Sequence, residues 1–87
     1  MKEMVLEKTH KITLYNDDKH SFAEVQACLI EFCRHDPIQA AQCATIVSNN
    51  GKHDVKSGSF DEMFDIITSL ADAGLDVKLN MNEGSLH

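Results

Sequence analysis

Alternating apolar and polar residues predict three strands in this chain of 87 residues. The alternation is clearest over residues 75–81, and it also runs over residues 10–15, where Ile12 and Leu14 share one face. A weaker pattern over residues 52–56 predicts a short strand there. The chain therefore has strand patterns near its beginning, near its end and at one place between them.

Between these strands, apolar residues recur at the spacing of amphipathic helices in three stretches. Each stretch begins with a residue type that caps helix N-termini, namely Ser21, Asp36 and Ser59. Gly51 and Gly74 follow the second and third stretches, as glycine does where a chain leaves a helix in the left-handed conformation. The positions predicted to face the core are, helix by helix, Phe22, Val25, Leu29, Phe32 and Cys33; Ala40, Cys43, Ala44 and Val47; and Phe60, Met63, Phe64, Ile67, Leu70 and Ala71.

The order strand, helix, helix, strand, helix, strand predicts an α+β fold, with three helices packed on one face of a three-stranded sheet. A chain of 87 residues has room for one such core and no second. We assign the domain to residues 10–81, with a short flexible arm at residues 1–9 and a frayed tail at residues 82–87.

The charge of the chain restricts its partners. Fourteen acidic residues against eight basic ones give a formal charge of −6, which disfavours nucleic acids and anionic membranes and favours a partner with a positive group, such as a free amino terminus. No apolar run approaches the ~20 residues of a membrane span, and the N-terminus has no signal-peptide core. Three cysteines without a paired spacing indicate a reducing, cytoplasmic setting.

The candidates for a metal site are Cys28, Cys33, His35 and Cys43. Cys28 and Cys33 are five residues apart, so they do not share one helical face. The paired short spacings of structural zinc sites are missing as well. We therefore interpret the cysteines as small apolar core residues and expect no metal.

Asp17 and Asp18, with His20 nearby, are the candidates for acid–base chemistry. A catalytic set would also need a nucleophile, and Ser21 is already explained as a helix cap. Because Asn-Asp-Asp is far more often a turn than a catalyst, we expect no enzyme. The other histidines, which are scattered and expected at the surface, are His10, His35, His53 and His87.

Two segments carry a resemblance to a known family. Residues 14–18 are Leu-Tyr-Asn-Asp-Asp and precede a capped helix, and residues 46–52 are Ile-Val-Ser-Asn-Asn-Gly-Lys. With the inferred order of elements, they resemble the ClpS family, the adaptors of Clp proteases, over about residues 10–81. In that family the first strand ends in an Asn-Asp-Asp turn, and the second segment contains Val-His-x-x-Gly-Lys.

The resemblance implies a non-enzymatic adaptor without a cofactor. Such adaptors bind substrates with a destabilising, usually bulky hydrophobic, N-terminal residue (an N-degron) and deliver them to a Clp-type AAA+ unfoldase. Asn16 and Asp17 match the positions that hold the substrate's α-ammonium, and Asp18 matches one that holds the peptide backbone. The positions that match the hydrophobic pocket are Leu14, Phe22, Val25, Ala44, Val47 and Leu75, and those that match the unfoldase-docking surface are Asp61 and Glu62.

The chain departs from the family at the ammonium site. Ser48 stands where the family has a histidine that helps to hold the α-ammonium, and the loss of one neutral hydrogen bond weakens binding by about 0.5–1.5 kcal/mol. We hypothesise that His20 or His53 replaces that histidine. Phe22 and Ala44 stand where methionine is common, which shifts the preferred cargo side chain.

Three functions remain open from the sequence. The leading hypothesis is an N-degron adaptor for a Clp unfoldase. The second is a domain of the same fold that docks on the unfoldase N-terminal domain and modulates substrate choice without recognising N-terminal residues, which the presence of Ser48 favours. The third, an enzyme or a metal protein, is disfavoured by the missing nucleophile and the ligand spacing.

Overall fold

The computed structural model describes residues 9–81. Its elements are, in chain order, β1 (His10–Tyr15), α1 (Phe22–Cys33), α2 (Pro37–Asn50), β2 (Lys52–Gly58), α3 (Phe60–Asp72) and β3 (Asp76–Met81). The predicted α+β class and order of elements are confirmed. The predicted tail, and the predicted arm apart from Thr9, lie outside the described residues. Among the helices of this described range, none is long and apolar enough to cross a bilayer.

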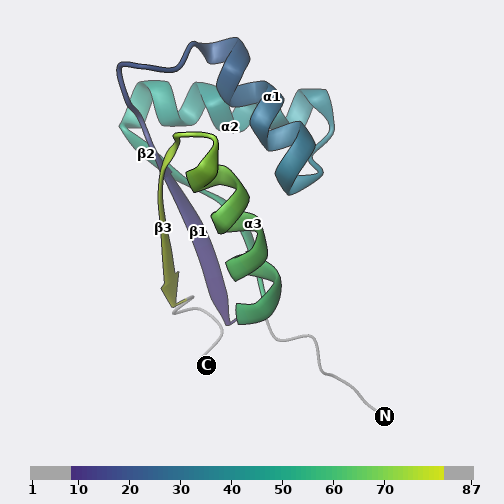
Figure 1. The fold of residues 1–87 in the computed structure, drawn as a ribbon. Helices are drawn as coiled ribbons and strands as arrows, with labels where there is room; N and C mark the ends of the chain where they lie inside the picture. Colours follow the sequence, from purple (N-terminus) through teal and green to yellow (C-terminus); the bar gives the residue numbers. More distant parts are fainter. Residues whose placement is uncertain (1–8, 82–87) are drawn as a thin grey trace.

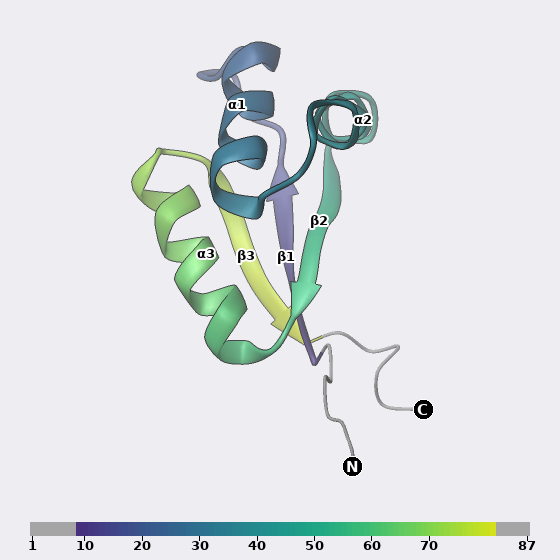
Figure 2. The ribbon, with the colours of Figure 1, turned by 90° about the vertical axis from the view of Figure 1, so that its right-hand side faces the viewer.

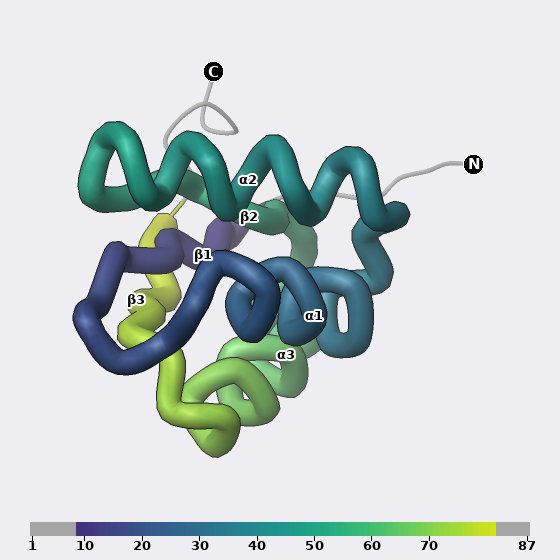
Figure 3. The backbone as a smooth tube through the Cα atoms, turned by 90° about the horizontal axis from the view of Figure 1, so that it is seen from above, coloured from purple at the N-terminus to yellow at the C-terminus, as the bar shows by residue number. Residues whose placement is uncertain are grey.

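The three strands form one antiparallel sheet in the order β2-β1-β3, so the first strand of the chain lies between the other two. α3 lies along one face of this sheet, and α1 packs beside it on the same side (Figures 1 and 2). α2 packs against α1 and lies over the end of β2, as the view from above shows (Figure 3). The described helices leave the other face of the sheet open (Figure 2).

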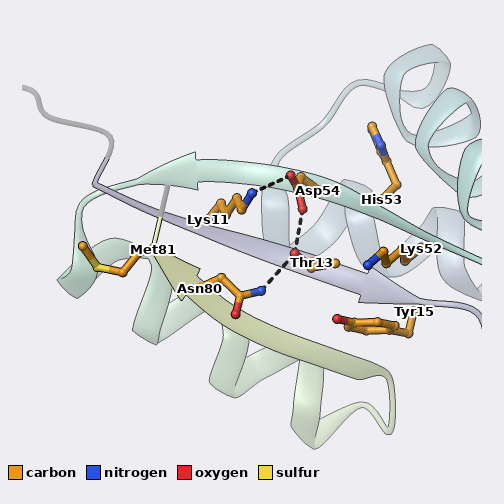
Figure 4. Close-up of a pocket in the computed structure, with 8 residues that line it drawn as sticks. All are labelled: Lys11, Thr13, Tyr15, Lys52, His53, Asp54, Asn80 and Met81. Carbon is orange, nitrogen blue, oxygen red and sulfur yellow. Dashed lines mark hydrogen bonds and ion pairs between the residues drawn. The ribbon is translucent and has the colours of Figure 1, made fainter. Parts of the chain in front are cut away.

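The alternation along β1 decides where the core lies. Ile12 and Leu14 are buried and belong to the core, whereas Lys11 and Tyr15 lie on the open face (Figure 4). Thr13 also points to the open face, but side chains of the neighbouring strands cover it. The buried core cluster consists of Ile12, Leu14, Leu29, Cys33, Ala40, Cys43, Val47, Val55, Met63, Leu70 and Leu75.

The predicted helix ends are confirmed. Ser21 and Ser59 each accept a hydrogen bond from the backbone N–H three residues later, and Asp36 does the same for α2. Gly51 and Gly74 have φ angles of +90° and +91°, a left-handed conformation that residues with a Cβ adopt only with strain. Local sequence alone therefore accounts for where these helices begin and where α2 and α3 end.

α3 buries fewer of its apolar residues than the sequence predicts. Met63 and Leu70 are buried, but Phe60 and Phe64 are 48% and 53% exposed, and Ala71 is exposed as well. Only one stripe of a helix faces the sheet in a two-layer domain, and the predicted set is wider than this stripe. Phe60 and Phe64 instead stack on each other, with ring centroids 5.7 Å apart.

The prediction that His35 lies at the surface is wrong. The register between β1 and β2 shifts between Ile12 and Thr13, which leaves Val55 as the extra residue of a β-bulge. His35 is buried, and its Nε2 donates to the Val55 carbonyl oxygen over 2.7 Å, which satisfies a backbone group that the bulge removes from the ladder. Arg34 ends α1 with a φ of 61° and so turns the chain toward the sheet. The remaining histidines are His10 and His53, which are half-buried, and His87, which lies outside the described residues.

Gly51→Ala should lower the free energy of unfolding by about 1–2 kcal/mol. A Cβ at Gly51 would meet no atom within 4 Å, so the loss comes from the left-handed backbone and not from a clash. Chemical denaturation measures this difference, with Asn50→Ala as the neighbouring control that should change stability by less than about 0.5 kcal/mol. A Gly51→Ala protein as stable as the wild type would contradict the account of this helix end.

Candidate functional site

The Asn-Asp-Asp turn and the end of α2 are joined by backbone hydrogen bonds. The N–H of Asn16 donates to the Gly51 carbonyl oxygen over 2.8 Å, and the N–H of Gly51 donates to the Val47 carbonyl oxygen over 2.9 Å. Because Tyr15 pairs with Lys52, the bond from Asn16 to Gly51 extends the β1–β2 ladder by one residue. Two segments that are distant in the sequence therefore meet at one end of the sheet.

A cavity of about 100 Å³ lies at this junction. Its apolar wall comes from α1 and α2: Ala44 and Val47 are buried, Val25 is half-buried, and Phe22 is 47% exposed although it was predicted to face the core. The structure thus gathers predicted binding and pocket residues around one cavity and adds a histidine to them. The lining residues are Asn16, His20, Phe22, Val25, Ala44, Val47 and Ser48.

Asn16 and Ser48 contribute polar groups to the cavity. Both residues are exposed, Asn16 directly after β1 and Ser48 in the last turn of α2. The hydrogen bonds found among residues 9–81 use neither the Asn16 side-chain amide nor the Ser48 hydroxyl. An amide oxygen and a hydroxyl oxygen are hydrogen-bond acceptors, so the cavity can accept hydrogen bonds beside an apolar wall.

Asp17 does not line the cavity itself and is held by its own turn directly after Asn16. Its Oδ1 accepts from the backbone N–H groups of Lys19 and His20 over 2.8 and 2.9 Å. The Nδ1 of His20 lies 3.2 Å from Oδ1 and 3.1 Å from Oδ2. The hydrogen bond from the His20 backbone is the largest cause that lowers the pKa of Asp17 below its ordinary 3.8, so the carboxylate is charged at neutral pH. Asp18 is exposed, and its side chain makes no such bond within the described residues.

His20 connects the cavity with the end of α3. Its Nε2 lies 3.2 Å from the Ala73 carbonyl oxygen, and the hydrogen bond to Asp17 is the largest cause that raises the pKa of His20 above its ordinary 6.5. Gly74 leaves room for the ring, since a Cβ there would lie 3.3 Å from the His20 Cε1. His20 was suggested by its position near the turn, but its contact with Ala73, 53 residues away, has no sequence signal.

The other predicted site residues lie elsewhere. Leu14 and Leu75 are 1% and 5% exposed and belong to the core cluster, and they do not line the cavity. Asp61 and Glu62 are exposed in the first turn of α3, outside the cavity. Glu62 is also the partner of Ser59 in the capping box.

The three cysteines lie in or against the core. Across residues 9–81, no three side chains of the kinds that ligate metals lie together. Burial raises the pKa of the Cys33 thiol to about 11, and burial also raises the pKa of Cys28 and Cys43. Cysteine binds metals as the thiolate, whereas these groups are neutral thiols packed in or against the core.

A separate hollow of about 570 Å³ lies on the open face of the sheet (Figure 4). Its central polar groups satisfy one another: Thr13 donates to Asp54 over 2.6 Å and accepts from Asn80 over 3.3 Å, while Lys11 pairs with the same aspartate over 3.2 Å. His53 lines this hollow and not the cavity at Ser48. Of the two histidines considered as replacements for the family histidine, only His20 lies at the cavity.

The structure defines a small α+β domain with an apolar cavity, rimmed by hydrogen-bond acceptors, where β1, α1 and α2 meet. The model of the family "ATP-dependent Clp protease adaptor protein ClpS" matches residues 6–77, and the chain belongs to this family. The structure of Agrobacterium tumefaciens ClpS2 bound to L-phenylalaninamide has a similar fold, with a TM-score of 0.81 at 18% identity over 87% of this chain and 99% of that chain. No curated protein matches the sequence.

Proposed function

We propose that this chain binds substrates through a bulky hydrophobic N-terminal residue and delivers them to a Clp-type AAA+ unfoldase. The observation that carries the proposal is the cavity, where the apolar side chains of Ala44 and Val47 lie beside the Asn16 amide and the Ser48 hydroxyl, which have no hydrogen-bond partner among residues 9–81. An N-terminal residue has the complementary groups, an apolar side chain and an α-ammonium on the same carbon atom. Membership of the ClpS family and the amino acid amide bound by the similar ClpS2 support this assignment.

The α-ammonium has donors and no acceptor, so its site must consist of acceptors. In this proposal the side-chain oxygen of Asn16 and the carboxylate of Asp17 accept from it, and the Ser48 hydroxyl takes the place of the family histidine. The charge-assisted bond to Asp17 contributes about 1.5–3 kcal/mol. Asp18 holds the backbone of the peptide beyond its first residue.

The size of the cavity favours Leu over an aromatic residue. Its volume of about 100 Å³ is smaller than the ~150 Å³ of an engineered apolar cavity that binds benzene. Compared with the methionine that is common in the family at both positions, Phe22 takes up more space at the cavity wall and Ala44 takes up less. Burial of one Leu side chain contributes about 1.5–3 kcal/mol. Leu14 and Leu75 belong to the same core cluster as Val47 of the wall.

Delivery requires a second surface that docks on the unfoldase. The exposed carboxylates of Asp61 and Glu62 at the start of α3 are the proposed part of that surface. In this role the protein works in the cytoplasm as a binding adaptor, without a cofactor and without catalysis.

A second candidate function is docking on the unfoldase without N-degron recognition. Two observations favour it: Ser48 stands in place of the family histidine, and the Asp17 carboxylate already accepts hydrogen bonds from His20. In this case the chain would modulate substrate choice through its docking surface alone. Peptide binding distinguishes the two functions.

A peptide with N-terminal Leu should bind with a dissociation constant on the order of 1–100 µM and more tightly than the same peptide starting with Phe or Trp. N-acetylation should abolish this binding, because it removes the positive charge of the amino group that Asp17 binds in this proposal. Fluorescence polarisation with labelled peptides measures the affinities. If none of the peptides with a free amino group binds, the N-degron proposal is wrong and docking alone remains.

Asp17→Ala tests the ammonium site within the same assay and should weaken binding of the Leu peptide by at least about tenfold. Asp65→Ala is the matched control, since this aspartate is exposed in the middle of α3, outside the Asn-Asp-Asp turn. Circular dichroism verifies that both variants are folded. Equal affinities for Asp17→Ala and Asp65→Ala would remove Asp17 from the site.

Ser48→His should strengthen binding of the Leu peptide by a few-fold to about tenfold, the equivalent of one neutral hydrogen bond. The substitution restores the family's residue at the cavity. Thr45→His is the matched control, because it adds the same side chain on α2 at an exposed position that does not line the cavity. Fluorescence polarisation compares both variants with the wild type. Unchanged or weaker binding by Ser48→His would contradict the account, because it would show that Ser48 does not lower the affinity relative to the family histidine.

A further inference from the structure

Both ring nitrogens of His20 face hydrogen-bond acceptors. Nδ1 lies 3.1 and 3.2 Å from the two oxygens of Asp17, and Nε2 lies 3.2 Å from the carbonyl oxygen of Ala73. Neither partner has a hydrogen to give, so each contact is a hydrogen bond only where the ring nitrogen carries one. A neutral imidazole has one N–H and the imidazolium has two. The arrangement is therefore satisfied at both ends only when His20 is protonated.

The groups around the ring favour the same charged form. Asp17 is in direct contact, and Glu24 on α1 adds a further attraction. α3 presents the Ala73 carbonyl at the negative end of its helix dipole. From α2, Ser48 faces the same cavity and has no charge. These surroundings raise the pKa of His20, with the hydrogen bond to Asp17 as the largest cause.

An α-ammonium that binds Asp17 meets this imidazolium at the same carboxylate. Oδ1 of Asp17 already accepts from two backbone N–H groups, and a carboxylate has about four lone-pair positions in all. The ammonium and the Nδ1–H of His20 would then take the two positions that remain, which lie on Oδ2, so the two cations would be held side by side at one carboxylate oxygen. Two positive charges a few ångströms apart also repel each other, which favours loss of one proton.

We propose that His20 is a positioning residue that holds Asp17 in the empty site and releases its ring proton to solvent when an N-terminal ammonium binds. This inference rests on the proposed function and adds its regulation. In the empty protein the protonated ring neutralises Asp17 and bonds to Ala73. In the complex the ammonium supplies that positive charge instead. Capture of cargo is consequently weaker in acid than at neutral pH.

The test is the affinity of a Leu-initiated peptide measured by fluorescence polarisation from pH 5.5 to pH 7.5. The wild-type affinity should rise roughly three- to tenfold over this range. His20→Gln keeps a neutral donor near Asp17 and should give a flat profile. His53→Gln, on the open face of the sheet, is the matched control and should keep the wild-type rise. The peptide's own amine, with a pKa near 8, affects all three proteins alike.

Isothermal titration calorimetry at pH 6.5, in two buffers of different ionisation enthalpy, counts the protons released on binding. Release is expected from the wild type and from His53→Gln, and none from His20→Gln. A flat wild-type profile without proton release, or an equal rise in His20→Gln, would overturn this inference while leaving peptide binding in place. If no protein binds the peptide at any pH, the proposed function fails and the inference fails with it.

Discussion

The backbone hydrogen bond from Asn16 to Gly51 is the constraint on which the site depends. It continues a register in which Tyr15 opposes Lys52, and a slip of one residue would separate the two groups and turn the strand's side chains to the wrong face. β1 is paired on both sides, so its register is set by β3 as well as by β2. The left-handed turn at Gly51 lets α2 pass directly into β2, and it brings the last turn of the helix next to the Asn-Asp-Asp turn.

The cavity and the core share residues, which couples the shape of one to the packing of the other. Val47 belongs to the core cluster and also lines the cavity, and Ala44 is buried in the cavity wall. These residues are fixed by close packing of α2 against α1 and the sheet. Phe22 is half exposed and lies in the same wall without that restraint. A substitution at Phe22 would therefore change the shape of the cavity with the least disturbance of the core.

Local signals in the sequence predicted most of the fold. Ser21, Asp36 and Ser59 are N-caps as expected, and strands occupy residues 10–15 and 76–81, the latter one residue shorter than the alternation at 75–81, with β2 longer than its weak pattern indicated. One prediction that failed, a surface position for His35, depends on contacts between distant segments. His35 is buried because a bulge in β2 frees a carbonyl group, and no local pattern reveals a bulge.

The candidate site divides in the same way. The turn and the end of α2 were recognisable as segments, and the fold brings Asn16, Ser48 and the apolar wall together. The bridge from His20 to Ala73 was not foreseeable, because it depends on how α3 ends relative to the first turn. The sequence also could not separate Leu14 and Leu75, which are core residues, from the residues that line the cavity.

The central claim is that an N-terminal residue binds at the junction of β1 and α2. Its most direct test is a titration of the ¹⁵N-labelled protein with L-leucinamide, followed by two-dimensional NMR. The account predicts that the largest shifts occur at the amides of Asn16, Asp17 and Ser48, and that N-acetyl-leucinamide causes none of them. Shifts confined to the open face of the sheet, or no shifts with the free amine, would contradict it.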